Sequence, residues 1–375
     1  MVLLTFLVIF YSVLIAVAVL GWLKLKETRL PDNYCPQNRL SVLIPVRNEA
    51  LNITNLLSDL AAQHYPKQLM EVLVIDDDSE DETAQLVQDH ARNSELNIRL
   101  LSLENGRGKG KKSAIGLGLE QATGQLIVQT DGDCRVKPCW LALLEHQYQS
   151  TGAKFISGPV CLQDNDRFFG KLQVVEFASL IGTGAAAIAM GKPNMCNGAN
   201  LAYEKAAFYH VGGFSGNEHL ASGDDEFLMH KIWKQFPGKV SFLKNSGATV
   251  FTPAAATVRQ FLGQRVRWAS KWRFYKNVAP QLVALLVFSV NAGLLIGLGA
   301  WLAGKTGTIH FWILWLAKSG IDFVFLGLVL RFFRRTRFLF YSLPLQLVYA
   351  PYVVYCALAG LTGNYRWKGR NLKNP

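Results

Sequence analysis

The 375-residue chain is 50% hydrophobic and 18% charged, whereas an ordinary soluble domain has about 25% charged residues. Its formal net charge of +12 is unevenly distributed: residues 253–375 hold sixteen Lys and Arg and one acid, and residues 1–252 hold 23 basic and 26 acidic side chains. This basic and strongly apolar C-terminal third indicates contact with an anionic membrane, and disfavours a wholly soluble enzyme, a disordered chain or a secreted disulfide scaffold. The six cysteines form no CxxC pair, so we expect reduced thiols and no zinc site.

The first segment, residues 1–23, contains no charged side chain and is long enough to cross a bilayer as a helix. It exceeds the roughly 7–15 residues of a signal-peptide core and lacks a basic start, which favours a retained span over a cleaved signal peptide. Lys24, Lys26 and Arg29 follow it directly. The positive-inside rule therefore places the downstream chain in the cytoplasm.

Residues 24–252 form a predicted cytoplasmic domain in which short apolar runs alternate with helical patterns. This alternation, with its short connections, predicts an α/β fold with a doubly wound, mostly parallel sheet. We expect strands at residues 40–45, 71–75, 98–103 and 125–130, and helices at residues 51–63, 83–94, 111–122 and 138–150. In such sheets ligands bind beyond the carboxyl ends of the strands.

Three of these strands end in polar clusters, at residues 45–49, 76–79 and 131–133. Their position at one edge of a parallel sheet suggests a cationic or metal-bound ligand. Two alternatives are purely structural. Ser79 and Glu82 have the spacing of a capping box, which would start a helix but would leave Asp76 and Asp77 unexplained. The third cluster could be an Asp-Gly turn.

The cluster at residues 131–133 also has the composition of a metal site. Asp131 and Asp133 flank Gly132, and two carboxylates so placed form a compact oxygen-ligand pair for Mg²⁺ or Mn²⁺. We therefore predict a divalent metal at Asp131 and Asp133.

Residues 106–113 form a basic, glycine-rich loop that leads into a helix. The Walker spacing fails, because Lys111 stands where the second glycine belongs. Such a loop can still hold a phosphate through backbone N–H groups and a lysine; the alternative is a solvated basic loop. Further on, the helical stripe of Phe168, Leu172 and Val175 predicts packing against a core or a membrane.

Residues 253–277 combine basic and aromatic side chains and predict an amphipathic helix at the membrane surface. Two spans follow, from residue 277 to 304 and from 306 to 330. Lys318 and Asp322 interrupt the second span at a spacing that lets them pair on one helix face; contact with a lipid head group is the alternative.

The last apolar stretch, residues 338–365, is ambiguous. It contains Pro344 and Pro351 and is followed by a basic tail, residues 366–375. A straight span would put that tail outside, against the positive-inside rule, whereas a kinked, re-entrant or hairpin arrangement would return it to the cytoplasm. We favour the second arrangement within the C-terminal membrane region, residues 278–365.

In this order and spacing, the motifs resemble those of the membrane-bound family 2 inverting glycosyltransferases. The resemblance covers roughly residues 39–276, and it implies a GT-A domain, the Rossmann-like fold of nucleotide-diphospho-sugar transferases, flanked by transmembrane helices. Gln264-Arg265-Val266-Arg267-Trp268 fits the QxxRW motif and is the most specific signal. The first strand end and the 198–200 and 212–214 segments are similar to those of the family.

The resemblance also implies roles for individual residues. Asp76 and Asp77 match the acidic pair whose second member contacts the nucleoside. Asp78 stands where many members have glycine, and Asp tolerates the left-handed geometry of such a turn. Lys111 matches the lysine that contacts the diphosphate, and Asp131 and Asp133 match the metal-binding DxD. The resemblance implies these nucleotide-sugar-binding residues: Pro45, Arg47, Glu49, Asp76, Asp77, Lys111, Asp131 and Gly132.

The catalytic residues implied by the resemblance are Asp224, Asp225, Gln264, Arg267 and Trp268. Asp224 replaces the usual glutamate of the Glu-Asp motif, so the general base falls on Asp225. Lys111 and Arg267 would stabilise the departing diphosphate, and Trp268 would line the acceptor channel.

The implied function is a transfer from a nucleotide-diphosphate sugar, expected to be UDP-linked, to a lipid or lipid-linked glycan acceptor, at the cytoplasmic face of a bacterial membrane. The protein would be a multi-pass membrane enzyme of cell-envelope biogenesis, with no nucleic-acid partner. A processive polysaccharide synthase of the same family is the alternative, since QxxRW occurs in both. A scaffold that has lost catalysis is disfavoured, because every acidic motif is filled.

Overall fold

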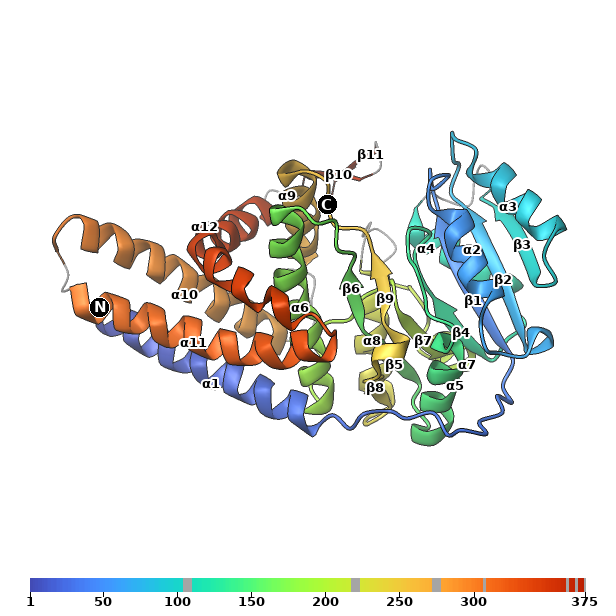
Figure 1. Cartoon of the computed structure of the whole chain (residues 1–375), viewed down its shortest axis with the longest axis horizontal. Coiled ribbons are helices and arrows are strands. Elements are labelled where there is room, and N and C mark those ends of the chain that lie inside the picture. The colour runs from blue at the N-terminus through green and yellow to red at the C-terminus, as the bar shows by residue number, and fades with distance from the viewer. Residues whose placement is uncertain are drawn as a thin grey trace. The chain divides into compact units, whose positions relative to one another are not determined.

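In a computed structural model, the chain divides into two compact units that alternate along the sequence (Figure 1). The structure describes residues 1–103, 110–216, 223–271, 278–305 and 308–361, and the backbone of residues 364–367 and 370–373. We call residues 25–163 and 187–253 the sheet unit. We call residues 1–24, 164–186 and 254–375 the helical unit.

The sheet unit is built on a seven-stranded sheet of order β3-β2-β1-β4-β7-β5-β8. Strands β3, β2, β1 and β4 are parallel, and β7 runs antiparallel to both of its neighbours. A second, two-stranded parallel sheet joins β6 to β9. The strands are β1 Leu40–Val46, β2 Met70–Asp76, β3 Asn97–Ser102, β4 Leu126–Gln129, β5 Phe155–Ser157, β6 Val160–Leu162, β7 Leu201–Glu204, β8 Val240–Phe242 and β9 Val250–Thr252. The predicted α/β class, with its mostly parallel sheet, is confirmed.

The first four helices of the sheet unit lie close to their predicted positions, and the last two were not predicted. They are α2 Ile53–Ala61, α3 Thr83–Arg92, α4 Lys111–Gln121, α5 Trp140–Thr151, α7 Lys205–His210 and α8 Asp224–Gln235. Gly118 shows why α4 fits so closely on the sheet: a Cβ there would lie 2.9 Å from the Ile75 side chain and 3.1 Å from that of Leu43. A side chain at this position would have to push the ends of the Ile75 and Leu43 side chains aside.

The proposed capping box at Ser79 and Glu82 is wrong. Helix α3 begins at Thr83, and the Ser79 hydroxyl donates a hydrogen bond to Asp76. Asp81 instead accepts hydrogen bonds from the Thr83 hydroxyl and from the backbone N–H of Thr83 and Ala50. An acid two residues ahead of the helix thus ties its start to the β1–α2 loop, which local spacing does not reveal.

The helical unit contains α1 Val2–Lys24, α6 Phe168–Ala189, α9 Val258–Ala269, α10 Val278–Leu302, α11 Thr308–Phe332, the short 3-10 helix η4 Thr336–Tyr341 and α12 Ser342–Gly360. The antiparallel strands β10 Asn364–Trp367 and β11 Arg370–Lys373 follow. Among the described residues, five segments are long and apolar enough to cross a membrane: α1, α6, α10, residues 309–332 of α11, and residues 336–360. Helix α6 was expected only as a packing segment, and 67% of its most apolar stretch is buried.

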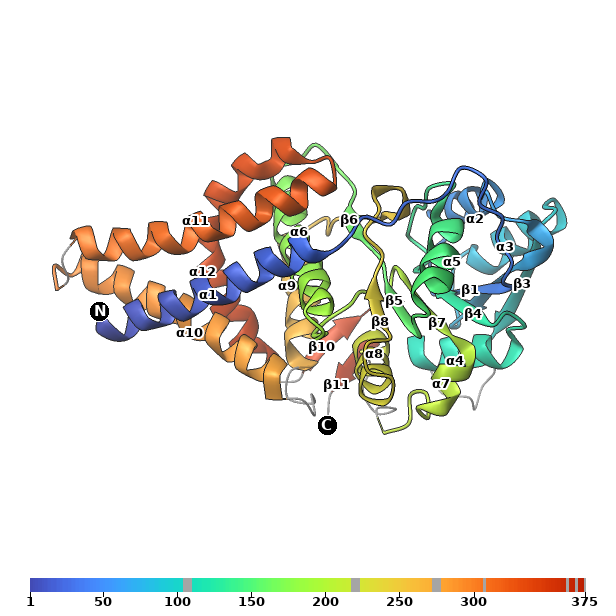
Figure 2. The same ribbon diagram turned by 90° about the horizontal axis from the view of Figure 1, so that it is seen from below.

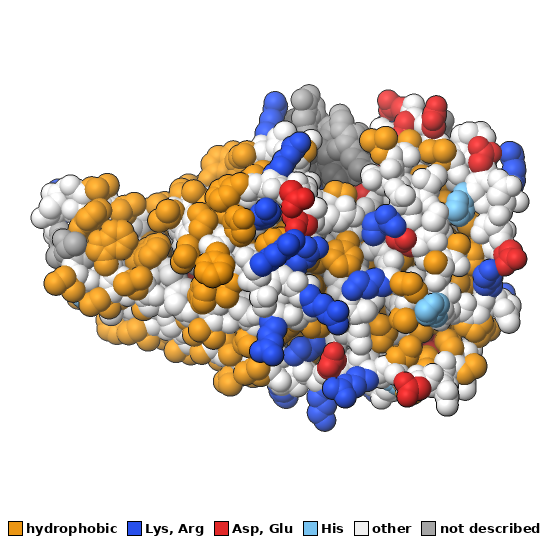
Figure 3. Space-filling model, viewed as in Figure 1, with side chains coloured by type: hydrophobic (Ala, Val, Ile, Leu, Met, Phe, Trp, Pro, Cys, Tyr) orange, Lys and Arg blue, Asp and Glu red, His pale blue; other side chains and the backbone are white. Residues whose placement is uncertain are grey.

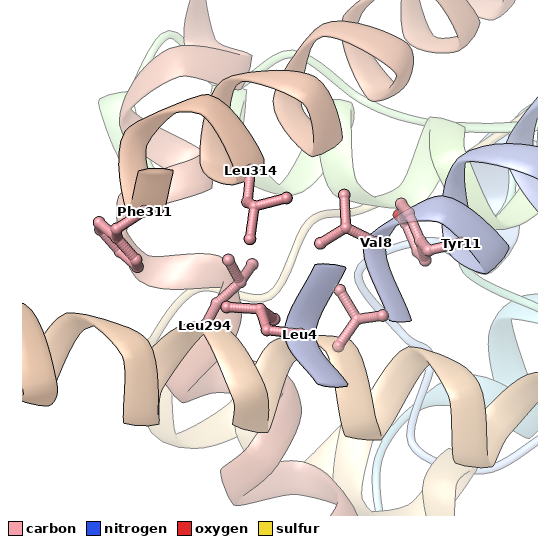
Figure 4. Packing of buried hydrophobic residues seen from close by; sticks show 7 residues of the cluster. Leu4, Val8, Tyr11, Leu294, Phe311 and Leu314 are labelled. Carbon is pink, nitrogen blue, oxygen red and sulfur yellow. The ribbon is translucent and has the colours of Figure 1, made fainter. Parts of the chain in front are cut away.

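Helices α1, α10 and α11 lie side by side (Figure 2) and share a dry core. Figure 4 shows Leu4 and Val8 of α1 pointing toward Leu294 of α10 and toward Phe311 and Leu314 of α11. In Figure 3 hydrophobic side chains cover the visible face of these helices, and Lys and Arg side chains gather where α11 ends. This pattern suits helices that face lipid along their length and water at one end.

The predicted pair of Lys318 and Asp322 forms inside this bundle. The Lys318 ammonium lies 2.8 Å from Asp322 and 2.8 Å from the Gln346 amide oxygen on α12. The Asp322 carboxylate also accepts hydrogen bonds from Tyr11 on α1 (2.8 Å) and from the Gln346 amide (3.0 Å). This polar cluster, which we define as Tyr11, Lys318, Asp322 and Gln346, joins α1, α11 and α12.

Small residues let α6 pack tightly within the helical unit. A Cβ on Gly21 of α1 would lie 2.6 Å from the Ala186 carbonyl oxygen. One on Gly182 would lie 2.5 Å from Val329 and 3.0 Å from Phe325 of α11. Such contacts are typical of helices that associate in membranes through small residues.

Helix α12 runs beside α9. The Phe261 and Tyr352 rings are in contact, with centroids 5.3 Å apart, and a Cβ on Gly360 would lie 3.3 Å from Ala269. Phe261 precedes Ala269 on α9, and their respective partners Tyr352 and Gly360 follow in the same order on α12. Helix α9 and the second half of α12 are therefore parallel. Near the start of α12, Arg335 and Arg337 of the segment between α11 and α12 pair with Asp164.

Candidate active site

The parallel strands bring the predicted acidic clusters to one edge of the sheet. Val46 at the end of β1 pairs with Asp76 at the end of β2, and Leu43 of β1 pairs with Gln129 at the end of β4. Asp131 follows two residues after Gln129. The expectation that these clusters share an edge is therefore confirmed.

Lys111 connects two of the predicted acidic motifs. Its ammonium lies 2.7 Å from Asp131 Oδ1 and 3.6 Å from Asp224 Oδ2. Burial disfavours the charged ammonium, but the nearby carboxylates outweigh burial and raise the pKa of Lys111 above its usual value. Lys111 is therefore a fixed cation at neutral pH.

Lys111 owes its position to the start of α4. Gly110, directly before the helix, has a φ of +102°, a conformation that side chains rarely adopt. The turn thus brings the lysine to the first position of the helix. The first half of the basic loop at residues 106–113, namely residues 106–109, lies outside the described residues.

Asp224 and Asp225 begin helix α8, after Gly223 with a φ of +85°. Asp225 Oδ2 accepts a hydrogen bond from the Gly198 N–H (2.8 Å), and its Oδ1 accepts one from the Glu226 N–H (2.8 Å). Two backbone donors thus fix the orientation of the Asp225 carboxylate. Asp224 is buried and faces Lys111, so the two acids of the motif have different surroundings.

Gln129 and Gly198 belong to this cluster, although neither was predicted as a site residue. The buried Gln129 amide donates to Asp224 (3.2 Å) and to the Gly198 carbonyl (3.4 Å). A Cβ on Gly198 would lie 2.9 Å from the Lys111 ammonium and 3.4 Å from Asp225. Their only sequence signal was position: Gln129 lies two residues before the DxD, and Gly198 lies in the segment that resembles the acceptor side.

Asp76 and Asp77 lie at the end of β2 and are 7% and 3% exposed. Asp76 accepts hydrogen bonds from the hydroxyl and the backbone N–H of Ser79. Asp78 has a φ of +62°, so the predicted tolerance of Asp for left-handed geometry at this turn is confirmed. The turn keeps the acidic pair at the sheet edge.

Arg47 and Glu49, both buried, are engaged in holding neighbouring loops. The Arg47 guanidinium donates to the carbonyls of Asp77 and Asp78 and to the Glu80 carboxylate. Glu49 accepts a hydrogen bond from Asn52 at 2.9 Å. Pro45 is part of β1. These contacts shape the loop of the acidic pair, and a direct role in nucleotide binding remains a prediction.

The predicted metal site lies in a tight turn, because the Cys134 N–H donates to the Asp131 carbonyl at 3.1 Å. A Cβ on Gly132 would lie 2.8 Å from Val46, so glycine is needed between the two acids. Among the described residues no group of three or more His, Cys, Asp and Glu side chains is placed to hold a metal. Two carboxylates are nonetheless a donor set that fits Mg²⁺ or Mn²⁺ when substrate phosphates complete the coordination.

The QxxRW motif lies on α9, in the helical unit. Gln264 accepts a hydrogen bond from Arg265, and the Trp268 ring lies 6.1 Å from the Phe177 ring. Arg267 is half-buried. The basic and aromatic side chains at residues 272–277, predicted to continue this surface helix, lie outside the described residues.

Comparison with known proteins agrees with this geometry. Residues 41–212 match the family model described as glycosyl transferase family 2. The solved mannosyltransferase PcManGT from Pyrobaculum calidifontis, in complex with GDP-Man and Mn²⁺, superposes with a TM-score of 0.58 at 21% identity, over 92% of this chain and 99% of its own. The sheet unit therefore has the fold of GT-A nucleotide-sugar transferases.

Two curated relatives agree with this class. Glycosyltransferase AglE from Haloferax volcanii is 30% identical over 194 residues, which are 50% of this chain and 58% of that protein. A poly-beta-1,6-N-acetyl-D-glucosamine synthase from Staphylococcus epidermidis is 24% identical over 237 residues, 61% of this chain and 53% of that one. The chain thus spans little more than half the length of these relatives. The family-model match and these relatives together support a family 2 glycosyltransferase domain over residues 41–212.

Proposed function

We propose that the protein transfers a sugar from a nucleotide-diphosphate donor, UDP-linked, to a lipid or lipid-linked acceptor at the cytoplasmic membrane face. The observation that carries the proposal is the cluster of Lys111, Asp131, Asp224 and Asp225 at one sheet edge. The cluster places the Lys111 cation and Asp131, an acid of the predicted metal site, near the Asp225 carboxylate, whose orientation is fixed by backbone hydrogen bonds. Inverting transfer requires these elements together.

Asp225 is the proposed general base. It would take the proton of the acceptor hydroxyl as that oxygen attacks the anomeric carbon of the sugar. The bond from this carbon to the diphosphate breaks, and the nucleoside diphosphate leaves with the electron pair. Attack opposite the leaving group inverts the anomeric configuration. The hydrogen bonds from Gly198 and Glu226 hold the carboxylate in one orientation, as a base needs.

The leaving diphosphate needs positive charge. Lys111 supplies one fixed charge, and Asp224 and Gln129 hold it in place. Asp131 and Asp133 are the proposed ligands of a divalent metal, which when bound supplies Lewis-acid stabilisation of the leaving group. The Mn²⁺ of the mannosyltransferase PcManGT supports a metal here. Asp76 and Asp77 are proposed to bind the nucleoside, and Arg267 and Trp268 to serve the diphosphate and the acceptor.

The membrane arrangement is also a proposal: α1, α10 and α11 span the bilayer, and α12 lies along its cytoplasmic surface beside α9. The start of α12 lies next to chain that leads directly to the sheet unit, and its second half lies along α9, which follows the sheet unit in sequence. Arg335 and Arg337 pair with Asp164, which follows the sheet unit in sequence, and Gly360 contacts the end of α9. The basic C-terminal tail would then be cytoplasmic, in accord with the positive-inside rule.

A processive synthase is the alternative, supported by the similarity to the poly-beta-1,6-N-acetyl-D-glucosamine synthase. The three proposed spans favour single transfer, because Leu, Val and Phe side chains fill the space between them. A polymer would need another path through the membrane.

The test uses the purified full chain in nanodiscs with radiolabelled UDP- and GDP-sugars, bacterial lipids and Mg²⁺ or Mn²⁺. We expect a lipid-linked product, and Asp225→Asn should slow its formation by at least about 100-fold while donor binding persists. Asp32→Asn, an exposed site, is the matched control. Long polymer would establish the alternative, and an unchanged rate for Asp225→Asn would refute the base assignment.

A further inference from the structure

Arg265, one of the two variable positions of the QxxRW motif, is among the most buried charges in the described part of the chain. Its side chain is 4% exposed, and that of its partner Glu176 on α6 is 3% exposed. A buried ion pair costs desolvation of both ions, and hydrogen bonds on every side are needed to offset that cost. The residues that hydrogen-bond to this pair, or pack on it, are therefore the ones that it can hold in place.

Glu176 is held from two sides. Its Oε1 accepts hydrogen bonds from Arg265 Nε (2.9 Å) and from the Tyr352 hydroxyl on α12 (2.9 Å). Its Oε2 accepts one from Arg265 Nη2 (2.5 Å). The paired bonds between guanidinium and carboxylate fix the plane of the arginine as well as its position.

The fixed guanidinium in turn contacts two motif residues. Its Nη1 donates to the Gln264 amide oxygen. Its carbon centre lies 4.3 Å from the centroid of the Trp268 ring and 4.6 Å from that of Phe261, within the range of cation–π attraction. Gln264 and Trp268 thus share one support, although they lie four residues apart on α9.

We propose that Arg265, Glu176 and Tyr352 form a positioning network that holds Gln264 and Trp268 in the orientations that sugar transfer requires. The inference rests on the proposed function for its consequence in catalysis, but not for the network itself. Arg265 acts through its neighbours and is no catalytic residue. On this proposal, α6 and α12 support the QxxRW motif of α9.

Lysine cannot replace Arg265 in this role. An ammonium makes no two-pronged contact with a carboxylate and presents no plane for stacking on an indole ring. Arg265→Lys therefore keeps the charge opposite Glu176 and removes the geometry. We expect Trp268 to lose its fixed orientation while the fold persists.

The first experiment needs no activity. The full chain, labelled with 5-fluorotryptophan, is purified in nanodiscs, and the Trp268 signal among the nine tryptophans is assigned by its loss in Trp268→Ala. Arg265→Lys should shift or broaden that fluorine signal. Arg167→Lys, the same change at an exposed position of the helical unit, should leave it unchanged. An unaltered Trp268 signal in folded Arg265→Lys would overturn the network.

The second experiment measures transfer. We expect Arg265→Lys to lower kcat by about 10- to 100-fold, with the KM for the donor unchanged. In the Trp268→Ala background the same change should cost little more, because its effect passes through that ring. A purely structural role would instead give an additive loss.

Two further outcomes are decisive. Should Arg265→Lys fail to fold, Tyr352→Phe removes a single hydrogen bond, and wild-type kcat with an unshifted Trp268 signal would then refute the proposal. Should the wild-type chain transfer no sugar, the proposed function fails, while the fluorine experiment still tests the network.

Discussion

At the scale of single residues, Gly198 shows how closely the site is packed. Its missing side chain leaves room for the Lys111 ammonium, and its N–H holds Asp225. We expect Gly198→Ala to lower kcat by about 100-fold, because a Cβ would displace the lysine or the base by a few tenths of an ångström or more. Thermal unfolding should change little.

Gly116→Ala on α4 is the control, since a Cβ there meets no atom within 4 Å. It should keep full activity and add about 0.5–1 kcal/mol of stability, as alanine does in helices. A fully active Gly198→Ala would show that Lys111 and Asp225 do not need their observed spacing.

Glu71 gives a prediction on pH. Burial raises the pKa of this carboxyl, but hydrogen bonds from Ser41 and Thr123, with the nearby Arg99, outweigh burial and lower the pKa below its usual 4.5. The stabilisation is therefore complete above pH 4.5 and is lost as the pH falls through the folded-state value. The melting temperature of Glu71→Gln should lie well below that of wild type at pH 7, and the gap should narrow below about pH 4. A constant gap would contradict this.

Sequence reasoning located the acids of the site but not their partners. Asp76, Asp77 and Asp131 follow predicted strands, so their position singled them out as candidates, whereas Asp225 was assigned through the family resemblance. Gln129 is one polar residue at the end of an apolar strand, and nothing in its neighbours says that it faces Asp224. That contact depends on how β4 and α8 meet, which only the fold determines.

At the scale of helices, the polar cluster around Lys318 links three elements of the membrane region. Lys318→Met would leave Asp322 charged and buried without its cation, at a cost of about 3–5 kcal/mol. The double variant Lys318→Met with Asp322→Asn removes both charges and keeps a hydrogen-bonding group opposite Tyr11.

We therefore expect the single variant to melt at a lower temperature than the double variant in nanodiscs. The reverse order would mean that the pair is not a structural unit and would favour the lipid-contact alternative for these residues.

Elements were predicted unevenly. The first four strands and the first four helices of the sheet unit follow from alternation of apolar runs, and their ends came within a few residues. Strands β5 to β9 and helices α7 and α8 were not predicted. Helix α6 was taken for packing alone, because Arg167, Lys171 and Glu176 obscure a span-like composition. Glu176 is tolerated there because Arg265 neutralises it, and that partner lies 89 positions away.

At the scale of the whole molecule, the proposed topology makes a direct prediction. A cysteine at position 305, between α10 and α11, should react with a membrane-impermeant maleimide on intact cells. A tag at the C-terminus should become accessible only after permeabilisation. Exposure of the tag on intact cells would show that α12 spans the bilayer.

The change of charge near residue 253 falls where the sheet unit gives way to the last segment of the helical unit. The sheet unit holds 23 of the 27 acids and 20 of the 39 bases, whereas the helical unit holds 4 acids and 19 bases, so the two units differ in their acids and not in their number of bases. Sequence order did not reveal that the separation is interrupted, since residues 164–186 belong to the helical unit although both flanking segments belong to the sheet unit.

This interruption bears on how the protein is made. Strand β7, which lies between β4 and β5, is synthesised after α6. The seven-stranded sheet therefore cannot be completed until the apolar helix α6 has left the ribosome. Helix α11, which packs on Gly182, follows more than 100 residues later, on the order of ten seconds at usual rates of translation. Both α1 and α11 pack on α6, but only α1 has been synthesised when α6 emerges from the ribosome. On the proposed topology, folding of the sheet unit in the cytoplasm would alternate with membrane insertion of the helices, and an insertase or chaperone that shields α6 during that interval would set the yield of folded protein.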